Sequence, residues 1–150
     1  MTLTIRVATL EDLPTLLHLH AEMDGASPIF LEQAQQVFQK MSQIPDYHSY
    51  LAFSEAEPVG TFSLLFVPTL MHPAIHKFAL LDAVVVRANY RSQGIGTTLV
   101  QEALKISAAA GCYKVTLSSN LKRDRAHAFY QSLGFKQHGW SFSLDLVPEG

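Results

Sequence analysis

The stretch VVVRANYRSQGIGTT, residues 84–98, decides the fold. It closes an almost wholly apolar run that begins at Phe78, and it then brings Gly94 and Gly96 to the predicted start of a helix. The first N–H groups of a helix have no partner within the helix, and the helix dipole adds partial positive charge there. Glycine has no Cβ, so an anion can approach this backbone closely, and Arg91 adds a full charge. The stretch therefore predicts a cradle for a pyrophosphate group between a buried strand and a helix.

Two common phosphate-binding motifs do not fit this stretch. A mononucleotide-binding P-loop needs Gly-Lys-Ser/Thr, and no lysine follows Gly96. A dinucleotide-binding Rossmann motif needs a third glycine or alanine where this chain has Leu99, and it lies near the start of its domain, whereas this stretch follows four candidate strands. The pyrophosphate of coenzyme A remains, because its pattern Gln/Arg-x-x-Gly-x-Gly/Ala after a buried strand matches Arg91–Gly96 without a mismatch.

The composition of the whole chain is that of a soluble globular protein. It has 150 residues, a net charge of −2, 48% hydrophobic and 16% charged residues, and one cysteine, which excludes a disordered chain and a disulfide-stapled scaffold. We expect a single domain over 1–150. The first residues do not read as a signal peptide and the run 79–86 is too short to span a bilayer, so we expect a cytoplasmic protein with no membrane partner.

Charge is distributed unevenly along the chain. Residues 1–86 are net acidic and residues 87–125 are net basic. This asymmetry suits a polyanionic ligand at the basic part, although charge alone favours a solvated positive face. The chain has no long basic stripe with interleaved aromatic residues, so no nucleic-acid partner is expected.

Hydrophobic periodicity and turn residues predict the order β-α-α-β-β-β-α-β-α-β-β, which is a mixed α/β sheet with helices on both faces. The apolar run 78–86 is typical of a central strand buried on both faces. The elements are expected at 5–7, 9–20, 30–41, 50–53, 59–67, 78–86, 94–110, 115–117, 126–133, near 135 and at 140–146.

A second motif supports the coenzyme A interpretation. The helix predicted at 126–133 contains Phe129-Tyr130-x-x-Leu133 and is followed by Gly134-Phe135. With both motifs in this order, the chain resembles the GNAT superfamily of N-acetyltransferases, in particular its glucosamine-phosphate and aminoalkylphosphonate branches. The resemblance covers nearly the whole chain in element order. It implies a GNAT-like, mostly antiparallel sheet, acetyl-CoA as the acyl donor, and a homodimer.

The resemblance also implies roles for individual residues. The main chain of 84–86 would pair with the pantetheine arm like an added strand, and an N–H near Val85 would hold the developing oxyanion. The amides of 92–97 would bind the pyrophosphate, and Asn120 would contact the pantetheine. The implied cofactor-binding residues are Val84, Val85, Val86, Arg91, Ser92, Gln93, Gly94, Ile95, Gly96, Thr97 and Asn120.

Tyr130 and Asp82 are the candidate catalytic residues. A phenol suits proton donation to a thiolate leaving group, and the resemblance places the general acid at Tyr130; the alternative is a core residue of an amphipathic helix. Asp82 interrupts an apolar strand, and parity predicts that it shares a face with Leu80, Val84 and Val86. It is the first candidate for the base that deprotonates an ammonium group, and the alternative is a structural hydrogen bond.

Other reactive residue types fit the chemistry less well. The histidines are poorly spaced for a metal site, so no metal is expected, although His72 or His76 could border the substrate. Cys112 reads as a small buried residue. Lys122, Arg123 and Arg125 suit cofactor phosphate or an anionic acceptor, and they suit a solvated loop at least as well.

The sequence thus predicts an enzyme that transfers the acetyl group of acetyl-CoA to a primary amine of a small metabolite. The amine would attack the thioester directly in a ternary complex. Three alternatives stay open: a non-catalytic acyl-CoA-binding sensor, a different acyl donor such as succinyl-CoA, and a protein amine as the acceptor. The acceptor itself and the acyl chain length are not predicted.

Overall fold

The computed structural model describes residues 2–23, 29–72, 74, 76–119 and 123–147. The chain separates into two compact units, one up to Leu117 and one from Ser118 onward. Within the described residues, no helix is long and apolar enough to cross a membrane.

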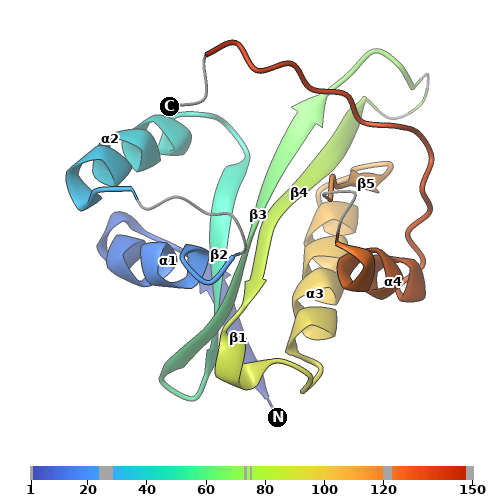
Figure 1. The fold of residues 1–150 in the computed structure, drawn as a ribbon. Helices are drawn as coiled ribbons and strands as arrows, with labels where there is room; N and C mark the ends of the chain where they lie inside the picture. Colours follow the sequence, from blue (N-terminus) through green and yellow to red (C-terminus); the bar gives the residue numbers. More distant parts are fainter. Residues whose placement is uncertain (1, 24–28, 73, 75, 120–122, 148–150) are drawn as a thin grey trace. The chain divides into compact units, whose positions relative to one another are not determined.

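The first unit is built on one five-stranded sheet with the order β1-β2-β3-β4-β5 (Figure 1). Its first four strands are antiparallel neighbours, and β5 is parallel to β4. The strands are β1 (Leu3–Val7), β2 (Tyr47–Ser54), β3 (Glu57–Pro68), β4 (Lys77–Val86) and β5 (Val115–Thr116). This arrangement confirms the predicted mixed, mostly antiparallel α/β sheet.

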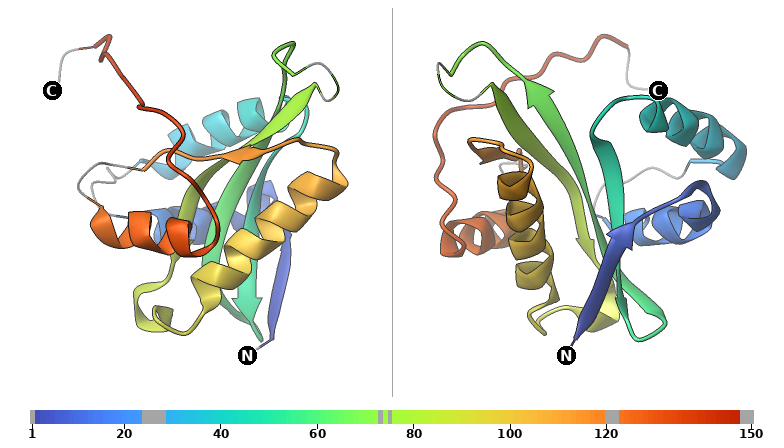
Figure 2. Two further views of the ribbon diagram at one scale, coloured as in Figure 1. Left: turned by 90° about the vertical axis from the view of Figure 1, so that its right-hand side faces the viewer. Right: turned by 180° about the vertical axis from the view of Figure 1, so that it is seen from behind.

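Helices cover both faces of this sheet. Helices α1 (Leu13–His20) and α2 (Leu31–Ser42) lie on one face, and α3 (Ile95–Ala109) lies on the other, as the two turned views in Figure 2 also show. Two short 3-10 turns, Leu10–Asp12 and Ala88–Tyr90, precede α1 and α3. The first of these turns begins at Thr9 as predicted, where the Thr9 N–H donates to the Asp12 carboxylate at 2.8 Å in a capping box.

Each face of the sheet has its own apolar core. On the α1 and α2 face, Leu16 and Leu19 pack with Leu51 of β2. On the α3 face, Leu99 lies against Gly60 of β3, where an added Cβ would come within 2.9 Å of a Leu99 methyl carbon. A glycine at 60 is therefore required for this close approach of α3 to the sheet.

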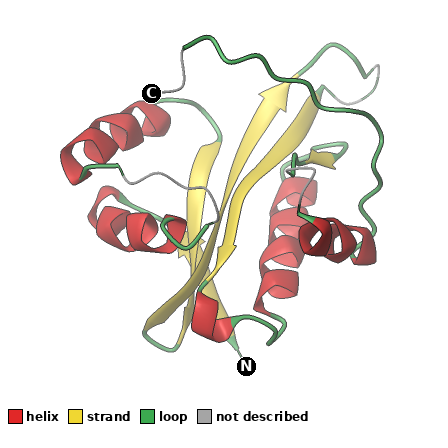
Figure 3. Ribbon diagram, in the orientation of Figure 1, coloured by secondary structure: helices red, strands yellow, loops and turns green. Residues whose placement is uncertain are grey.

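The second unit contains helix α4 (Asp124–Ser132), which is followed by Gly134 with a φ of 97°. The two strands predicted after this helix, near Phe135 and at 140–146, are absent from the described residues 135–147, which Figure 3 draws as loop. The alternation of apolar and polar residues is present there, but the side chains of Trp140 and Phe142 are 83% and 85% exposed. The prediction was wrong because alternation indicates a strand only where a partner strand is at hand.

Candidate active site

Strand β4 has one open edge. Toward β3 it is paired along most of its length, but toward β5 only Ala79 and Leu80 are paired, with Val115 and Thr116. From Leu81 onward this edge carries no partner strand among the described residues. Leu80 is 37% exposed and Asp82 is exposed, so β4 is less buried than its apolar sequence predicted. An open edge of this kind can accept an extended ligand as an added strand.

A β-bulge interrupts β4 beside Asp82. Ser63 pairs with Asp82 but Thr61 pairs with Val85, so β4 has one residue more than β3 in this interval. Ala83 lies in the bulge with a φ of 51°, a left-handed conformation that residues with a side chain rarely adopt. The bulge reverses the alternation of side chains along the rest of the strand.

This reversal corrects the predicted position of Asp82. Val86 pairs with Gly60, which faces α3, whereas Asp82 pairs with Ser63 on the opposite face. Asp82 therefore shares a face with Leu80, as predicted, but not with Val84 and Val86. Parity counted along the sequence cannot detect an inserted residue, because the bulge is visible only in the pairing with β3.

The pairing with β3 also determines which way the N–H and C=O groups of residues 84–86 point. The Arg87 N–H donates to the Val59 carbonyl at 2.9 Å, which makes this a hydrogen-bonded pair. Alternation then directs the amide groups of Val85 toward β3 and those of Val84 and Val86 toward the open edge. The N–H offered to a ligand beside the bulge is thus that of Val84 rather than that of Val85.

The predicted phosphate cradle forms a concave backbone at the start of α3. Ser92 and Gly94 have φ values of 64° and 82°, and such alternating left-handed residues turn successive N–H groups toward one point. The first amide bonded in the helix is Thr98, which donates to the Gly94 carbonyl at 3.1 Å. The N–H groups of residues 92–97 have no acceptor among the residues that the structure describes. Six such donors at a helix start suit a phosphate oxyanion.

Arg91 is held beside this cradle by main-chain oxygens. Its Nε donates to the Val86 carbonyl at 3.1 Å, and its Nη2 donates to the Glu22 carbonyl at 3.3 Å. The Glu22 carboxylate accepts the Ala88 N–H at 2.9 Å. Nothing in the sequence indicated this role of Glu22, because it lies 66 residues before its partner.

Asp82 faces two titratable groups on the α1 and α2 side of the sheet. Burial lowers the pKa of the His20 imidazole, and the negative charge of Asp82 partly opposes this shift. Burial raises the pKa of the Tyr47 phenol, and Asp82 raises it further. Tyr47 also lines a cavity of about 180 Å³ with Phe38 and His48. The charge of Asp82 therefore acts on both His20 and Tyr47, neither of which the sequence predicted.

The remaining predicted residues lie in the second unit. Tyr130 is on α4, half-buried, with its ring centroid 5.2 Å from that of Phe129 and 5.7 Å from that of Phe135. Asn120 and Lys122 lie outside the described residues. Arg123 and Arg125 are exposed.

Cysteine and histidine side chains show no arrangement for covalent or metal chemistry in the part of the chain that the structure describes. Burial raises the pKa of the Cys112 thiol, and the charge of Lys77 only partly opposes it, so the reactive thiolate is disfavoured. His72 stacks on the ring of Tyr113 at 4.5 Å and accepts the Ala74 N–H at 3.3 Å through its Nδ1.

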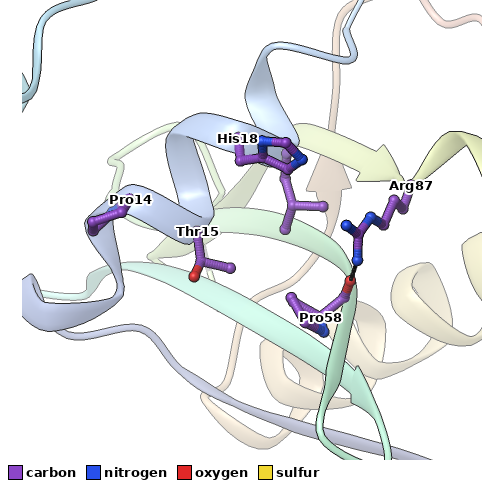
Figure 4. Close-up of a pocket in the computed structure, with 6 residues that line it drawn as sticks. Pro14, Thr15, His18, Pro58 and Arg87 are labelled. Atoms are coloured by element: carbon purple, nitrogen blue, oxygen red, sulfur yellow. Dashed lines mark hydrogen bonds between the residues drawn. The ribbon is translucent and has the colours of Figure 1, made fainter.

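A further pocket of about 290 Å³ opens between α1 and the end of β4 (Figure 4). It is lined by Thr15 and His18 of α1 and by Pro58 and Arg87. The Arg87 guanidinium there donates to the Pro58 carbonyl at 3.2 Å and to the Glu57 carboxylate at 3.1 Å, so its charge is already neutralised. No predicted site residue lines this pocket.

Two curated proteins are similar to this chain in sequence. Glucosamine 6-phosphate N-acetyltransferase of Trypanosoma brucei brucei is 35% identical over 88 residues, which cover 59% of this chain and 57% of that protein. Aminoalkylphosphonate N-acetyltransferase of Salmonella typhimurium is 34% identical over 102 residues, covering 68% and 65%. The matched part thus spans less than two thirds of the length of these relatives.

A solved structure and a family model extend the likeness to most of the chain. The structure of a protein from Agrobacterium tumefaciens str. C58 is 33% identical, covers 95% of this chain and 99% of its own, and superposes with a TM-score of 0.86. The model of the acetyltransferase (GNAT) family matches residues 13–135, which include β4, the cradle, α3 and α4. The chain belongs to the GNAT acetyltransferase family.

Proposed function

We propose that this chain is an N-acetyltransferase that moves the acetyl group of acetyl-CoA to a primary amine of a small metabolite. One observation carries the proposal: the open edge of β4, which includes the bulge at Ala83, is followed in the chain by the N–H groups of 92–97, which have no acceptor among the described residues. An extended chain that ends in a pyrophosphate needs these two features in this order. Pantetheine joined to a nucleotide diphosphate has this shape.

The donor set of the site fits acetyl-CoA. The N–H groups of 92–97 suit the pyrophosphate oxygens, and the left-handed Gly94 has open space around the position of its missing Cβ. The outward amide groups of Val84 and Val86 suit the amides of the pantetheine arm, although the Val86 carbonyl already accepts a bond from Arg91. Bound acetyl-CoA would supply an activated acyl thioester.

Groups of the chain would then polarise the thioester carbonyl, deprotonate the ammonium group and protonate the thiolate. The Val84 N–H would hold the oxyanion that develops on the thioester carbonyl as the amine nitrogen attacks. Asp82, directly or through a water, would take the proton of the ammonium group, and Tyr130 would give a proton to the departing thiolate. The C–N bond forms as the C–S bond breaks, and the products are an N-acetyl amine and free coenzyme A.

The acceptor belongs to the class of small amines. Both curated relatives carry names of small phosphorus-containing amines, and the acidic first part of this chain suits a cationic amino group. Asp82 and Tyr47, with the cavity that Tyr47 lines, offer such an amine a place on the α1 and α2 face. The proposal includes one catalytic domain over 1–150, a cytoplasmic location and a homodimer. Family likeness supports only the homodimer, and light scattering tests it.

Calorimetric titration of acetyl-CoA tests the proposal most directly. We expect micromolar binding by the wild-type protein and none by Gly96→Glu, because a carboxylate at the helix start repels the pyrophosphate. Gly139→Glu is the matched control, because Gly139 lies in the second unit with open space around its Cβ position. A panel of small amines, read by release of the coenzyme A thiol, then identifies the acceptor.

Each outcome of this titration has a distinct meaning. No binding by the folded wild-type protein would remove the cofactor and the mechanism together. Binding without thiol release for any small amine would leave either an acyl-CoA sensor or an enzyme that acts on a protein amine, and a lysine-rich peptide separates the two.

A further inference from the structure

Glu22 makes two contacts with the loop 87–91, which joins β4 to the phosphate cradle. Its carboxylate Oε2 accepts the N–H of Ala88, the first residue of the turn that leaves β4. Its main-chain carbonyl accepts the guanidinium of Arg91, which also donates to the Val86 carbonyl. One residue outside the cradle thus holds the loop 87–91 on two sides.

The backbone of Glu22 is itself fixed to α1. The Glu22 N–H donates to the Leu19 carbonyl at 3.1 Å, and the following Met23 N–H donates to the His20 carbonyl at 3.0 Å. Leu19 is buried in the core of the α1 face, so this last turn cannot shift without disturbing that core. Glu22 therefore fixes the loop 87–91 relative to α1.

The carboxylate of Glu22 has two opposing effects on the binding of an anionic ligand. A carboxylate beside a binding site for a polyanion opposes binding by simple repulsion. A fixed side chain that accepts a main-chain N–H can still favour binding, because it holds the loop in the conformation that the ligand requires. The two effects have opposite signs, so an experiment can separate them.

We propose that Glu22 is a positioning residue of the acetyl-CoA site, which sets the conformation of 88–94 through its bond to the Ala88 N–H. The role rests on the proposed function and assigns Glu22 no contact with the substrate. His20, two residues earlier, responds to the charge of Asp82. The segment 20–22 therefore carries a side chain that senses the charge of Asp82 and a carboxylate that holds the loop before the cradle.

Two substitutions separate position from charge. Glu22→Gln keeps an oxygen acceptor for the Ala88 N–H and removes the charge, whereas Glu22→Ala removes both. We expect Glu22→Gln to bind acetyl-CoA at least as tightly as the wild type, and Glu22→Ala to raise the Kd about tenfold through loss of one charge-assisted bond. In turnover, Glu22→Ala should raise KM for acetyl-CoA and leave kcat within about twofold.

Amide hydrogen exchange measures how well the loop 87–91 is held in the protein without ligand. The Ala88 amide should exchange faster in Glu22→Ala and at the wild-type rate in Glu22→Gln. Glu32→Ala, which removes a carboxylate from the first turn of α2, should change neither exchange nor affinity. Failure of wild-type binding would contradict the proposed function, whereas the exchange result still decides the role of Glu22 in the loop.

A variant of the donor, Ala88, tests whether Glu22 acts through its bond to the Ala88 N–H. Ala88→Pro removes the N–H, and proline fits here because Ala88 is the first residue of its turn and the preceding Arg87 has an extended ψ of 137°. In this background, Glu22→Ala should have no further effect on affinity. The proposal is overturned if both Glu22 variants bind more tightly than the wild type, if the Ala88 amide exchanges equally in all three proteins, or if the Ala88→Pro and Glu22→Ala effects simply add.

Discussion

Tyr130 is the proposed general acid, so its hydroxyl tests whether the chain is an acetyltransferase or a binding module. Its ring packs beside Phe129 and Phe135, and Tyr130→Phe keeps this packing while it removes the only proton donor of the side chain. We expect kcat to fall about a hundredfold, the range of a lost general acid, with acetyl-CoA affinity unchanged.

The matched control for Tyr130 is Tyr113→Phe, whose ring stacks on His72 in the first unit. It should leave both kcat and affinity at wild-type values. Parallel loss of turnover and of cofactor binding in Tyr130→Phe would instead assign Tyr130 a structural role.

His20 reports the charge of Asp82. Burial lowers the pKa of its imidazole, while the negative charge of Asp82 stabilises the protonated form and so raises it. Asp82→Asn removes only the raising contribution, so the pKa of His20 should fall further below its ordinary value. Titration of the His20 ring protons by NMR measures this shift, and Glu11→Gln serves as a charge-matched control. An unchanged or raised pKa in Asp82→Asn would place Asp82 away from His20.

At the scale of elements, the bulge in β4 determines which groups reach the site. Ala83 adopts a left-handed conformation there, which is costly for a β-branched side chain and accessible to glycine. We expect Ala83→Val to lower the free energy of unfolding by about 1–2 kcal/mol and Ala83→Gly to change it by less than about 0.5 kcal/mol. Urea unfolding measures both. Equal or greater stability of Ala83→Val would mean an extended backbone at this position.

The sequence predicted features that depend on neighbouring residues and missed those that depend on contacts between residues far apart in the chain. The capping pair of Thr9 and Asp12 lies within four residues, and the start of α3 is marked by Gly94, so both were predictable. The bulge depends on how β4 pairs with β3, and the bond from Ala88 to Glu22 joins residues far apart in the chain. Neither affects local periodicity or composition, which is why parity along the sequence wrongly puts Val84 and Val86 on the face of Asp82.

For the whole molecule, the C-terminal segment departs most from the sequence pattern. Apolar and polar residues alternate at 140–146 as in a half-buried strand, yet the described residues form none. Alternation specifies which side chains could share a face but not which edge they would meet. A row of large apolar side chains exposed to water is unfavourable, and fluorescence measures whether this segment is exposed in solution.

Trp140 gives that measurement, because it is the only tryptophan of the chain. Its side chain is 83% exposed, so we expect the emission of a solvated indole and full quenching by iodide. Trp140→Phe removes the signal and identifies its source. A protected, blue-shifted tryptophan would contradict the exposed segment and show that the alternating residues are paired. Dilution combined with light scattering would then separate the two sources of that pairing: protection lost together with a fall in mass requires a second copy of the chain, whereas protection kept in a monomer requires a partner strand within the same chain.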